Sequence, residues 1–164
     1  MNINEALVKK DSLPFRQGAI ALVLNKNNKV LLVQMLSYKE NQWRFPGGGI
    51  DEDEKPGDAL LREFSEELGS DKFEIIAESK YKTEYFWPEE IIKMRHEQKG
   101  ELFKGQQQYQ FLVKYSGEEN EINPDPNEIK KIKWISINEL PEHLIFNGQL
   151  ELTQKVLKEF NLID

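Results

Sequence analysis

The sequence predicts an α+β fold in which a mixed β-sheet is packed between helices. Several apolar or alternating stretches have the length of a strand and are separated by turn residues, whereas Pro56–Leu68 and residues 150–160 repeat apolar side chains at helical spacing. The chain has 164 residues, about the length of one ordinary domain. We therefore expect residues 1–164 to form a single domain.

The first predicted element is a β-hairpin. Residues 19–24 and 30–35 are continuous apolar runs, and the Asn-Lys-Asn-Asn-Lys segment between them is rich in turn residues. Residues 43–46 then lead into Gly47, Gly48 and Gly49, where the absence of side chains permits close approaches. We expect these glycines to lie in a loop.

A helix is predicted over Pro56–Leu68. Proline fits the first turn of a helix, Leu61, Phe64 and Leu68 recur at three- and four-residue spacing, and Gly69 is placed to end the helix. The remaining elements follow from the same two periodicities. We expect strands in residues 73–87, 106–115 and 129–137, a charged irregular stretch over residues 88–105, and an amphipathic helix over residues 150–160.

Composition limits the function classes. The formal net charge is −7, so the chain lacks the basic footprint of a protein that coats RNA or DNA, and we expect no duplex nucleic acid as a partner. There are no cysteines and only two histidines, which excludes thiolate chemistry and disfavours a histidine-rich zinc site. No apolar run approaches the roughly 20 residues of a membrane span. These features, and an N-terminus without the pattern of a secretory signal, favour a cytoplasmic protein with no membrane partner.

Three carboxylates are predicted to share one face of the helix. At roughly 3.6 residues per turn, Glu63, Glu66 and Glu67 lie opposite the apolar stripe. Like charges at this spacing repel one another, and a hard divalent cation would offset the cost because Mg²⁺ takes oxygen ligands. A merely solvated acidic face, with Arg62 as a local counter-ion, is the alternative that helical periodicity alone leaves open.

The spacing around this helix resembles the Nudix box. Five residues separate Gly48 from Glu54, seven more precede Arg62, and the sequence then reads Arg-Glu-Phe-Ser-Glu-Glu-Leu-Gly over residues 62–69. All seven fixed identities of the box match, and Phe64 suits its first apolar position. Ser70 departs from the pattern, which has an apolar residue at its last position, and this departure puts local packing in question more than catalysis.

The resemblance implies a Nudix fold, with a catalytic loop, helix and loop, and a metal-dependent hydrolase of phosphoanhydride bonds. Glu63, Glu66 and Glu67 would hold Mg²⁺, for which Mn²⁺ can substitute, and one of them can act as a base on the attacking water. Arg62 would orient these carboxylates, and Glu54 would pair with Arg62. The backbone carbonyl of Gly47 would be a further metal ligand.

The wider chain is similar to bacterial RNA pyrophosphohydrolases and the related dinucleoside tetraphosphate hydrolases. The similarity lies in residues 43–50, 85–88, 104–111 and 122–124, and in Glu128 and Trp134. In that subfamily a glutamate ahead of the tryptophan-bearing strand adds a carboxylate to the metal site, and Glu128 matches it. Alternatively, Glu128 only balances Lys130, Lys131 and Lys133.

The resemblance implies a nucleotide or an RNA 5′ end as the substrate. We expect four polar side chains to contact it, namely Arg44, Lys93, Lys104 and Gln106. The cations of residues 88–105 would serve equally as a solvated surface, and Tyr85 and Phe86 could stack on a base or belong to the core. Hydrolysis of sugar nucleotides or oxidised nucleoside triphosphates, and a nucleotide-binding Nudix module without activity, remain open, as does the oligomeric state.

Overall fold

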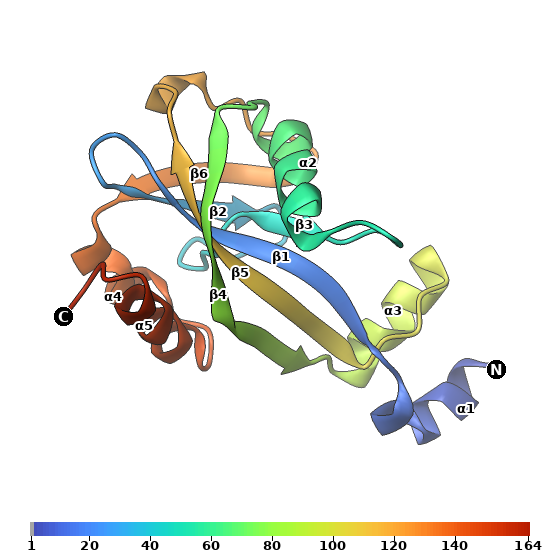
Figure 1. Cartoon of the computed structure of the whole chain (residues 1–164). Helices are drawn as coiled ribbons and strands as arrows, with labels where there is room; N and C mark the ends of the chain where they lie inside the picture. Colours follow the sequence, from blue (N-terminus) through green and yellow to red (C-terminus); the bar gives the residue numbers. More distant parts are fainter. Residues whose placement is uncertain (1) are drawn as a thin grey trace.

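The computed structural model describes residues 2–164 and consists of a curved sheet with helices on both faces and at one end (Figure 1). The strands run in the order β4-β5-β1-β2-β6, with the short β3 paired to β1. The strands are β1 Phe15–Leu24, β2 Val30–Met35, β3 Gly47–Gly49, β4 Phe73–Phe86, β5 Gly105–Tyr115 and β6 Ile129–Ile135. The sheet is mixed, as the sequence predicts, because β1 and β5 are parallel while the other neighbours are antiparallel.

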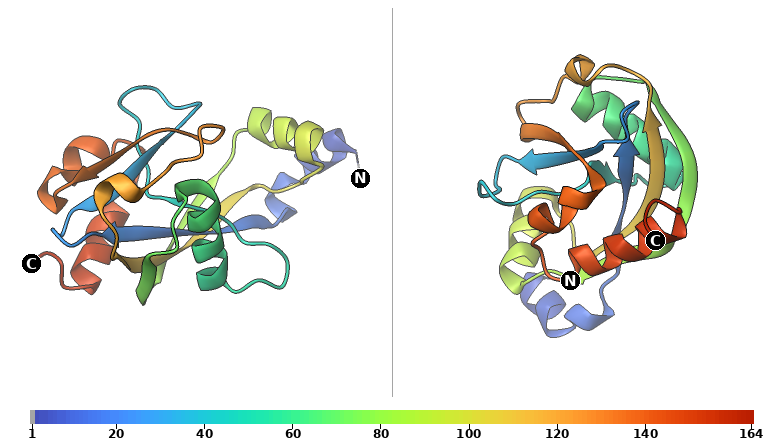
Figure 2. Two further views of the ribbon diagram at one scale, coloured as in Figure 1. Left: turned by 90° about the horizontal axis from the view of Figure 1, so that it is seen from above. Right: turned by 90° about the vertical axis from the view of Figure 1, so that its left-hand side faces the viewer.

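The helices are α1 Ile3–Val8, α2 Pro56–Leu68, α3 Glu89–Lys99, α4 Leu140–His143 and α5 Gln149–Glu159, with three 3₁₀ turns between them. Figure 2 shows α2 on one face of the sheet and α4 with α5 on the other, while α1 and α3 lie together at one end. Within residues 2–164, none of the helices combines the length and the hydrophobicity needed to cross a bilayer.

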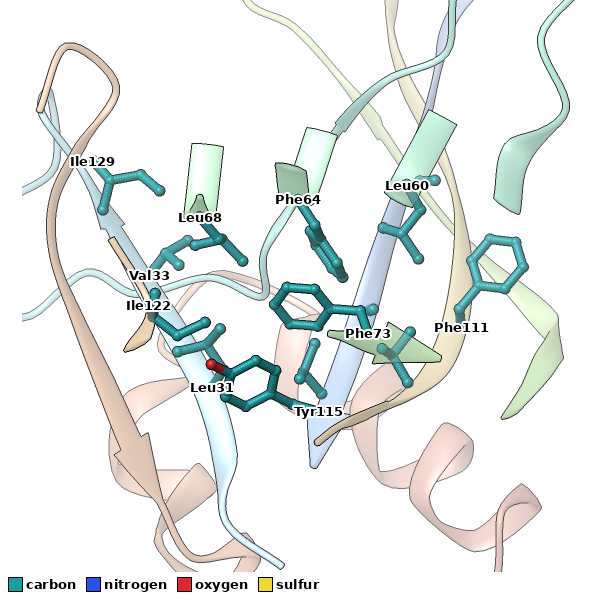
Figure 3. Close-up of a cluster of buried hydrophobic side chains, with 14 residues drawn as sticks. Leu31, Val33, Leu60, Phe64, Leu68, Phe73, Phe111, Tyr115, Ile122 and Ile129 are labelled. Atoms are coloured by element: carbon teal, nitrogen blue, oxygen red, sulfur yellow. The ribbon is translucent and has the colours of Figure 1, made fainter. Parts of the chain in front are cut away.

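Successive side chains of β1 point to opposite faces of the sheet and so contribute to a separate part of the core on each face. Ala19, Ala21 and Val23 face α2 and pack with its apolar stripe. Leu22, which points the other way, packs with Leu157 of α5. Figure 3 shows the α2 side, where Phe64 points toward Phe73, and the two ring centroids are 4.7 Å apart. The buried stripe contains Leu60, Phe64 and Leu68, whereas Leu61, which its spacing predicts to belong to the stripe, is 38% exposed. Burial of this stripe fixes the rotation of α2 and leaves Glu66 exposed and Glu63 and Glu67 partly buried.

The bounds of α2 are those expected from the sequence. Pro56 occupies the first turn, and Gly69 ends the helix in the left-handed conformation with φ +64°. A distant segment then provides a hydrogen bond to the C-terminal end of the helix, since the amide of Asn123 donates to the carbonyl of Leu68 at 2.9 Å. This contact accommodates Ser70, whose hydroxyl accepts from the amide of Lys72 instead of packing in the core.

The structure corrects the expectation of a loop at the three glycines. Gly47, Gly48 and Gly49 form β3, which pairs antiparallel with residues 18–20 of β1. A Cβ atom on Gly47 would overlap the carbonyl of Ala19, so only glycine allows this close pairing. The triple glycine therefore brings the start of the catalytic segment onto the sheet.

The expectation of an irregular stretch over residues 88–105 was wrong for its first half, which forms α3. Only Ile92 of this helix is buried, so the apolar periodicity that reveals an amphipathic helix is almost absent. The bounds of the helix are set by Pro88, which precedes it, and by Gly100, which ends it with φ +68°. Its position is set by α1, which packs beside it and which helical periodicity cannot reveal.

Candidate active site

Glu63 reaches the sheet because Gly48 has no side chain. A Cβ atom on Gly48 would overlap the carboxyl group of Glu63, so the pairing of β3 with β1 and the docking of α2 together leave room for this carboxylate. The side chain of Glu63 is only 14% exposed. The glycine and the glutamate of the motif are thus in contact across two elements.

Arg62 links the acidic groups of the site. Its Nε donates to Glu54 at 2.8 Å, one terminal nitrogen donates to Glu63 at 3.0 Å, and the other donates to the carbonyl of Gly49 at 3.1 Å. A weaker contact of 3.3 Å joins it to Glu66. These bonds raise the pKa of Arg62 further, so the guanidinium is a permanent charge that orients the carboxylates around it.

Glu54 is predicted to stabilise the site only where its carboxyl group is ionised. Its bonds to Arg62 and to the amide of Asp51 lower its pKa to about 2, below the unfolded value of 4.5. A depressed carboxyl pKa adds stability above the unfolded value, and this stability is lost as pH falls from 4.5 toward 2. We expect Glu54→Gln to lower the melting temperature at pH 7, and the difference from the wild type, measured by calorimetry, to shrink below pH 4.5 and to be mostly lost near pH 2. A constant difference across this range would contradict the assignment.

A second acidic group forms where α2 meets the segment before β6. The amide of Asp125 donates to the carbonyl of Glu67 at 2.8 Å, and the turn that follows carries Glu128 toward the same end of the helix. Burial, and then the neighbouring carboxylate of Glu63, raise the pKa of Glu67 to about 8, and Glu128 adds to the effect while Arg44 opposes it. The partly buried Glu63 and Glu67 and the exposed Glu128 thus concentrate acidic groups at this end of α2.

This charge and these donors fit a divalent cation. Across residues 2–164, no three acidic or histidine side chains converge into a finished ligand set, and Glu66, with its side chain 60% exposed, faces Arg62. Mg²⁺ requires no such cage, since it is commonly held by one or two carboxylates together with substrate phosphates. The carboxylates of Glu63 and Glu67 can supply that minimum, and the carbonyl of Gly47 stays a predicted further ligand.

A cavity of about 560 Å³ lies on the face of the sheet opposite α2, and Arg44, whose charge acts on Glu67, is among its lining residues. Its floor is formed by Ile20 of β1 and by Gln108 and Gln110 of β5, and its rim by Tyr38 and Phe146, whose ring centroids are 5.5 Å apart. Its volume is within the range of small-ligand sites, and it offers aromatic faces beside amide groups. These are the groups that recognise a nucleobase.

Arg44 connects the cavity to the carboxylates. It lines the cavity, and one terminal nitrogen donates to the carbonyl of Gly47 at 3.3 Å, while its positive charge opposes the raised pKa of Glu67. Its Nε is buried without a hydrogen-bond partner among residues 2–164. An anionic substrate group would satisfy this donor.

The structure separates the other residues expected to contact substrate. Gln106 lies beside the cavity, where its Oε1 accepts from the hydroxyl of Tyr85 at 3.1 Å. Lys104 instead donates to the carbonyl of Asp11 at 3.1 Å and lies over the ring of Phe15. Lys93 is exposed on α3. Contact of these residues with substrate stays a prediction.

Sequence reasoning missed Arg16, Tyr38 and Phe146. The guanidinium of Arg16 lies against Gly49, where a Cβ atom would overlap it, and burial lowers its pKa, with Arg95 adding to the decrease and Glu101 and Glu63 opposing it. The alternation of β1 places Arg16 on the cavity face, a signal that the sequence does carry. Tyr38 and Phe146 lie in segments without periodicity, so only the fold brings them together.

Comparison with known proteins identifies the family and the fold of the chain. The model of the NUDIX domain matches residues 14–156. An RNA pyrophosphohydrolase of Rickettsia africae (strain ESF-5) is 36% identical over 154 residues, covering 93% of each chain, and one of Bartonella henselae is 34% identical, covering 95% of each. Among solved structures, a C. elegans Ap4A hydrolase superposes with a TM-score of 0.62 at 17% identity, covering 89% of this chain and 99% of the other. The E. coli dihydroneopterin triphosphate pyrophosphohydrolase gives 0.63 at 16%, covering 88% and 96%.

Proposed function

Because this chain belongs to the Nudix family, we propose that it removes pyrophosphate, or phosphate stepwise, from the 5′ end of triphosphate or diphosphate RNA, and that it also accepts dinucleoside polyphosphates. The observation that carries the proposal is the connection, through Arg44, between the carboxylates of α2 and a cavity of nucleoside size. The names of the relatives, which match over more than nine tenths of this chain, support the same substrate class.

The hydrolysis requires a divalent cation, which we propose to be Mg²⁺ with Mn²⁺ as a substitute. When bound, such an ion lowers the pKa of water and neutralises charge on the bridging phosphate. Glu63, Glu67 and Glu128 would hold it, with the carbonyl of Gly47 and the substrate phosphates as further ligands. Glu66 would join them by leaving Arg62, whose bond to Glu66 at 3.3 Å is the longest of the five that its guanidinium donates.

The remaining groups bind and orient the substrate. Arg62, held by Glu54, fixes the position of Glu63. Arg44 and Arg16 would contact phosphate oxygens from the cavity side of β3, where guanidinium groups form paired hydrogen bonds to phosphate. The terminal base would enter the cavity, stack on Phe146 or Tyr38, and bond to Gln108 and Gln110.

The net charge of −7 restricts how much of an RNA is held. Recognition would be confined to the terminal phosphates and the first nucleotides, because an acidic surface repels the backbone that follows. We propose that the protein acts in the cytoplasm on unpaired 5′ ends, with residues 1–164 as one catalytic domain.

A substrate panel tests the proposal directly. The protein is incubated with Mg²⁺ and with 5′-triphosphate RNA, diadenosine tetraphosphate, sugar nucleotides and nucleoside triphosphates, and the products are identified by chromatography. We expect release of pyrophosphate or phosphate from the RNA and cleavage of the dinucleoside. If a sugar nucleotide or a nucleoside triphosphate is cleaved rapidly and the RNA is not cleaved, that compound is the substrate class and the proposed one is wrong. Binding without cleavage of any compound would indicate a non-catalytic module.

Glu128 provides a separate test outside the motif. If its carboxylate joins the metal site, Glu128→Ala should reduce kcat by at least about 30-fold, or roughly 2 kcal/mol of transition-state stabilisation, with an unchanged melting temperature. Asp125→Asn in the same turn removes an equal charge and serves as the control. A loss of less than about threefold in Glu128→Ala would show that the residue only balances the nearby lysines.

A further inference from the structure

Of the cations on α3, Arg95 is the one that the fold holds in place. Its Nε and a terminal nitrogen donate to the same carboxylate oxygen of Glu101, at 3.0 and 2.7 Å, and its guanidinium lies 4.6 Å from the ring centre of Trp87. Its side chain is only 19% exposed. Lys93 and Lys99 are exposed and form no ion pair within residues 2–164. Arg95 is therefore preorganised, whereas the two lysines are solvated.

The contacts of Arg95 lead directly to the active site. Trp87, on which it stacks, lies two residues after Tyr85, so their side chains share one face of the extended chain. Tyr85 donates to Gln106, and Gln106 pairs in register with Arg16 on the adjacent strand. The helix that carries Arg95 lies beside α1 at one end of the sheet, whereas the cavity extends to Leu152 and Thr153 of α5 (Figure 2). The charge of Arg95 also contributes to the lowered pKa of Arg16, which is consistent with a short separation.

Arg16 and Arg95 carry more positive charge than their surroundings neutralise. Glu101 pairs with Arg95, but Arg16 forms no hydrogen bond or ion pair through its side chain within residues 2–164. Glu63, the next carboxylate on the other side, is already bonded to Arg62. Partial burial of two guanidinium groups with only one carboxylate between them costs free energy, and an anion bound between them would offset this cost.

We infer that Arg95 and Arg16 together bind the outermost phosphate of the substrate, so that α3 makes the enzyme prefer triphosphate over diphosphate ends. The inference rests on the proposed function, which places the cleaved bond at Glu63 and Glu67. From that point the phosphate chain extends in two directions, toward the nucleoside in the cavity and away from it. Arg16, which lies against Gly49, and α3 at the end of the sheet would lie in the second direction, where a third phosphate extends further than a second.

A purely structural ion pair would explain the same contacts, since Arg95 and Glu101 also join α3 to the segment that follows it. The two roles predict effects of opposite sign for substitution of Glu101. If the pair only stabilises the fold, Arg95→Gln and Glu101→Gln should be harmful to a similar degree. If Arg95 binds phosphate, Arg95→Gln weakens binding, but Glu101→Gln removes a competing carboxylate and strengthens it.

Calorimetric titration with inorganic pyrophosphate and Mg²⁺ measures this sign without turnover, because pyrophosphate is the expected product. We expect Arg95→Gln to weaken binding by about tenfold and Glu101→Gln to strengthen it by about threefold. Lys99→Gln, which removes the same charge from an exposed position of α3 that is not expected to contact substrate, should change binding by less than about twofold. Weakening in both Arg95→Gln and Glu101→Gln, or equal weakening in Lys99→Gln, would overturn the inference. Melting temperatures of all three variants show whether each is folded.

Turnover gives a second readout that separates this inference from the proposed function. Arg95→Gln should lower kcat/KM for triphosphate RNA about tenfold while changing that for diphosphate RNA less than twofold. An equal loss on both ends would contradict a site for the outermost phosphate even though the hydrolase activity stands. If the wild type cleaves no RNA but the pyrophosphate affinities change with the expected signs, the phosphate site stands and the substrate is another polyphosphate.

Discussion

Glu67→Gln is expected to abolish most of the turnover, by at least about 10³-fold, while the protein stays folded. Glutamine keeps the shape of the side chain but removes the negative charge that holds the cation, and metal stabilisation of a phosphoryl transition state is worth several kcal/mol. The same change should raise the melting temperature in the absence of metal, because burial and the carboxylate of Glu63 disfavour the charged form of Glu67. Opposite effects on activity and stability are typical of a functional site.

Steady-state kinetics with Mg²⁺ and scanning calorimetry in a chelator measure the two effects. Glu74→Gln removes an equal charge from an exposed position of β4 and should alter neither. Glu66→Gln should also lower turnover if Glu66 leaves Arg62 to join the metal. Near-normal turnover of Glu67→Gln with Mg²⁺ would contradict the assignment of the site.

A base-paired 5′ end is expected to react about 100-fold more slowly than the same end unpaired. The phosphates must reach the carboxylates of α2 while the first base enters a cavity bounded by the sheet and by residues 146–153, which a stacked base pair cannot do. Opening two stacked pairs costs roughly 3 kcal/mol, which corresponds to about two orders of magnitude.

One triphosphate RNA measured alone and after annealing to a strand that covers its 5′ end gives this ratio. The same RNA annealed to a strand that pairs only with its 3′ half is the control and should react as fast as the free RNA. Equal rates on covered and uncovered ends would mean that the base stays outside the cavity.

The periodicity of apolar residues predicted the helices and strands that bury either one face or all of their side chains. The apolar spacing of Pro56–Leu68 placed α2 within its observed bounds, and the runs at residues 19–24 and 30–35 lie within β1 and β2. It could not reveal α3, of which only Ile92 is buried, nor β3, whose pairing with β1 depends on backbone contact rather than on side chains.

For the site, residues close in sequence were predicted together and those distant in sequence were not. The pairing of Arg62 with Glu54 and the concentration of carboxylates on α2 follow from the motif, and the structure has both. Arg16, Tyr38 and Phe146 were missed, because the parallel register of β1 with β5 and the meeting of residues 38 and 146 across the cavity have no local signal.

By itself the sequence determined the chemistry: a helix with one apolar face must present its glutamates together, and their spacing from Gly48 and Glu54 identifies the Nudix motif. The tertiary structure alone decided what surrounds that chemistry. It placed a cavity lined by Arg44 on the face of the sheet opposite α2, and it fixed Arg95 on Trp87 while leaving Lys93 in solvent. The physical reason is that helical periodicity is a property of neighbouring residues, whereas burial and charge pairing depend on segments that only the folded chain brings into contact.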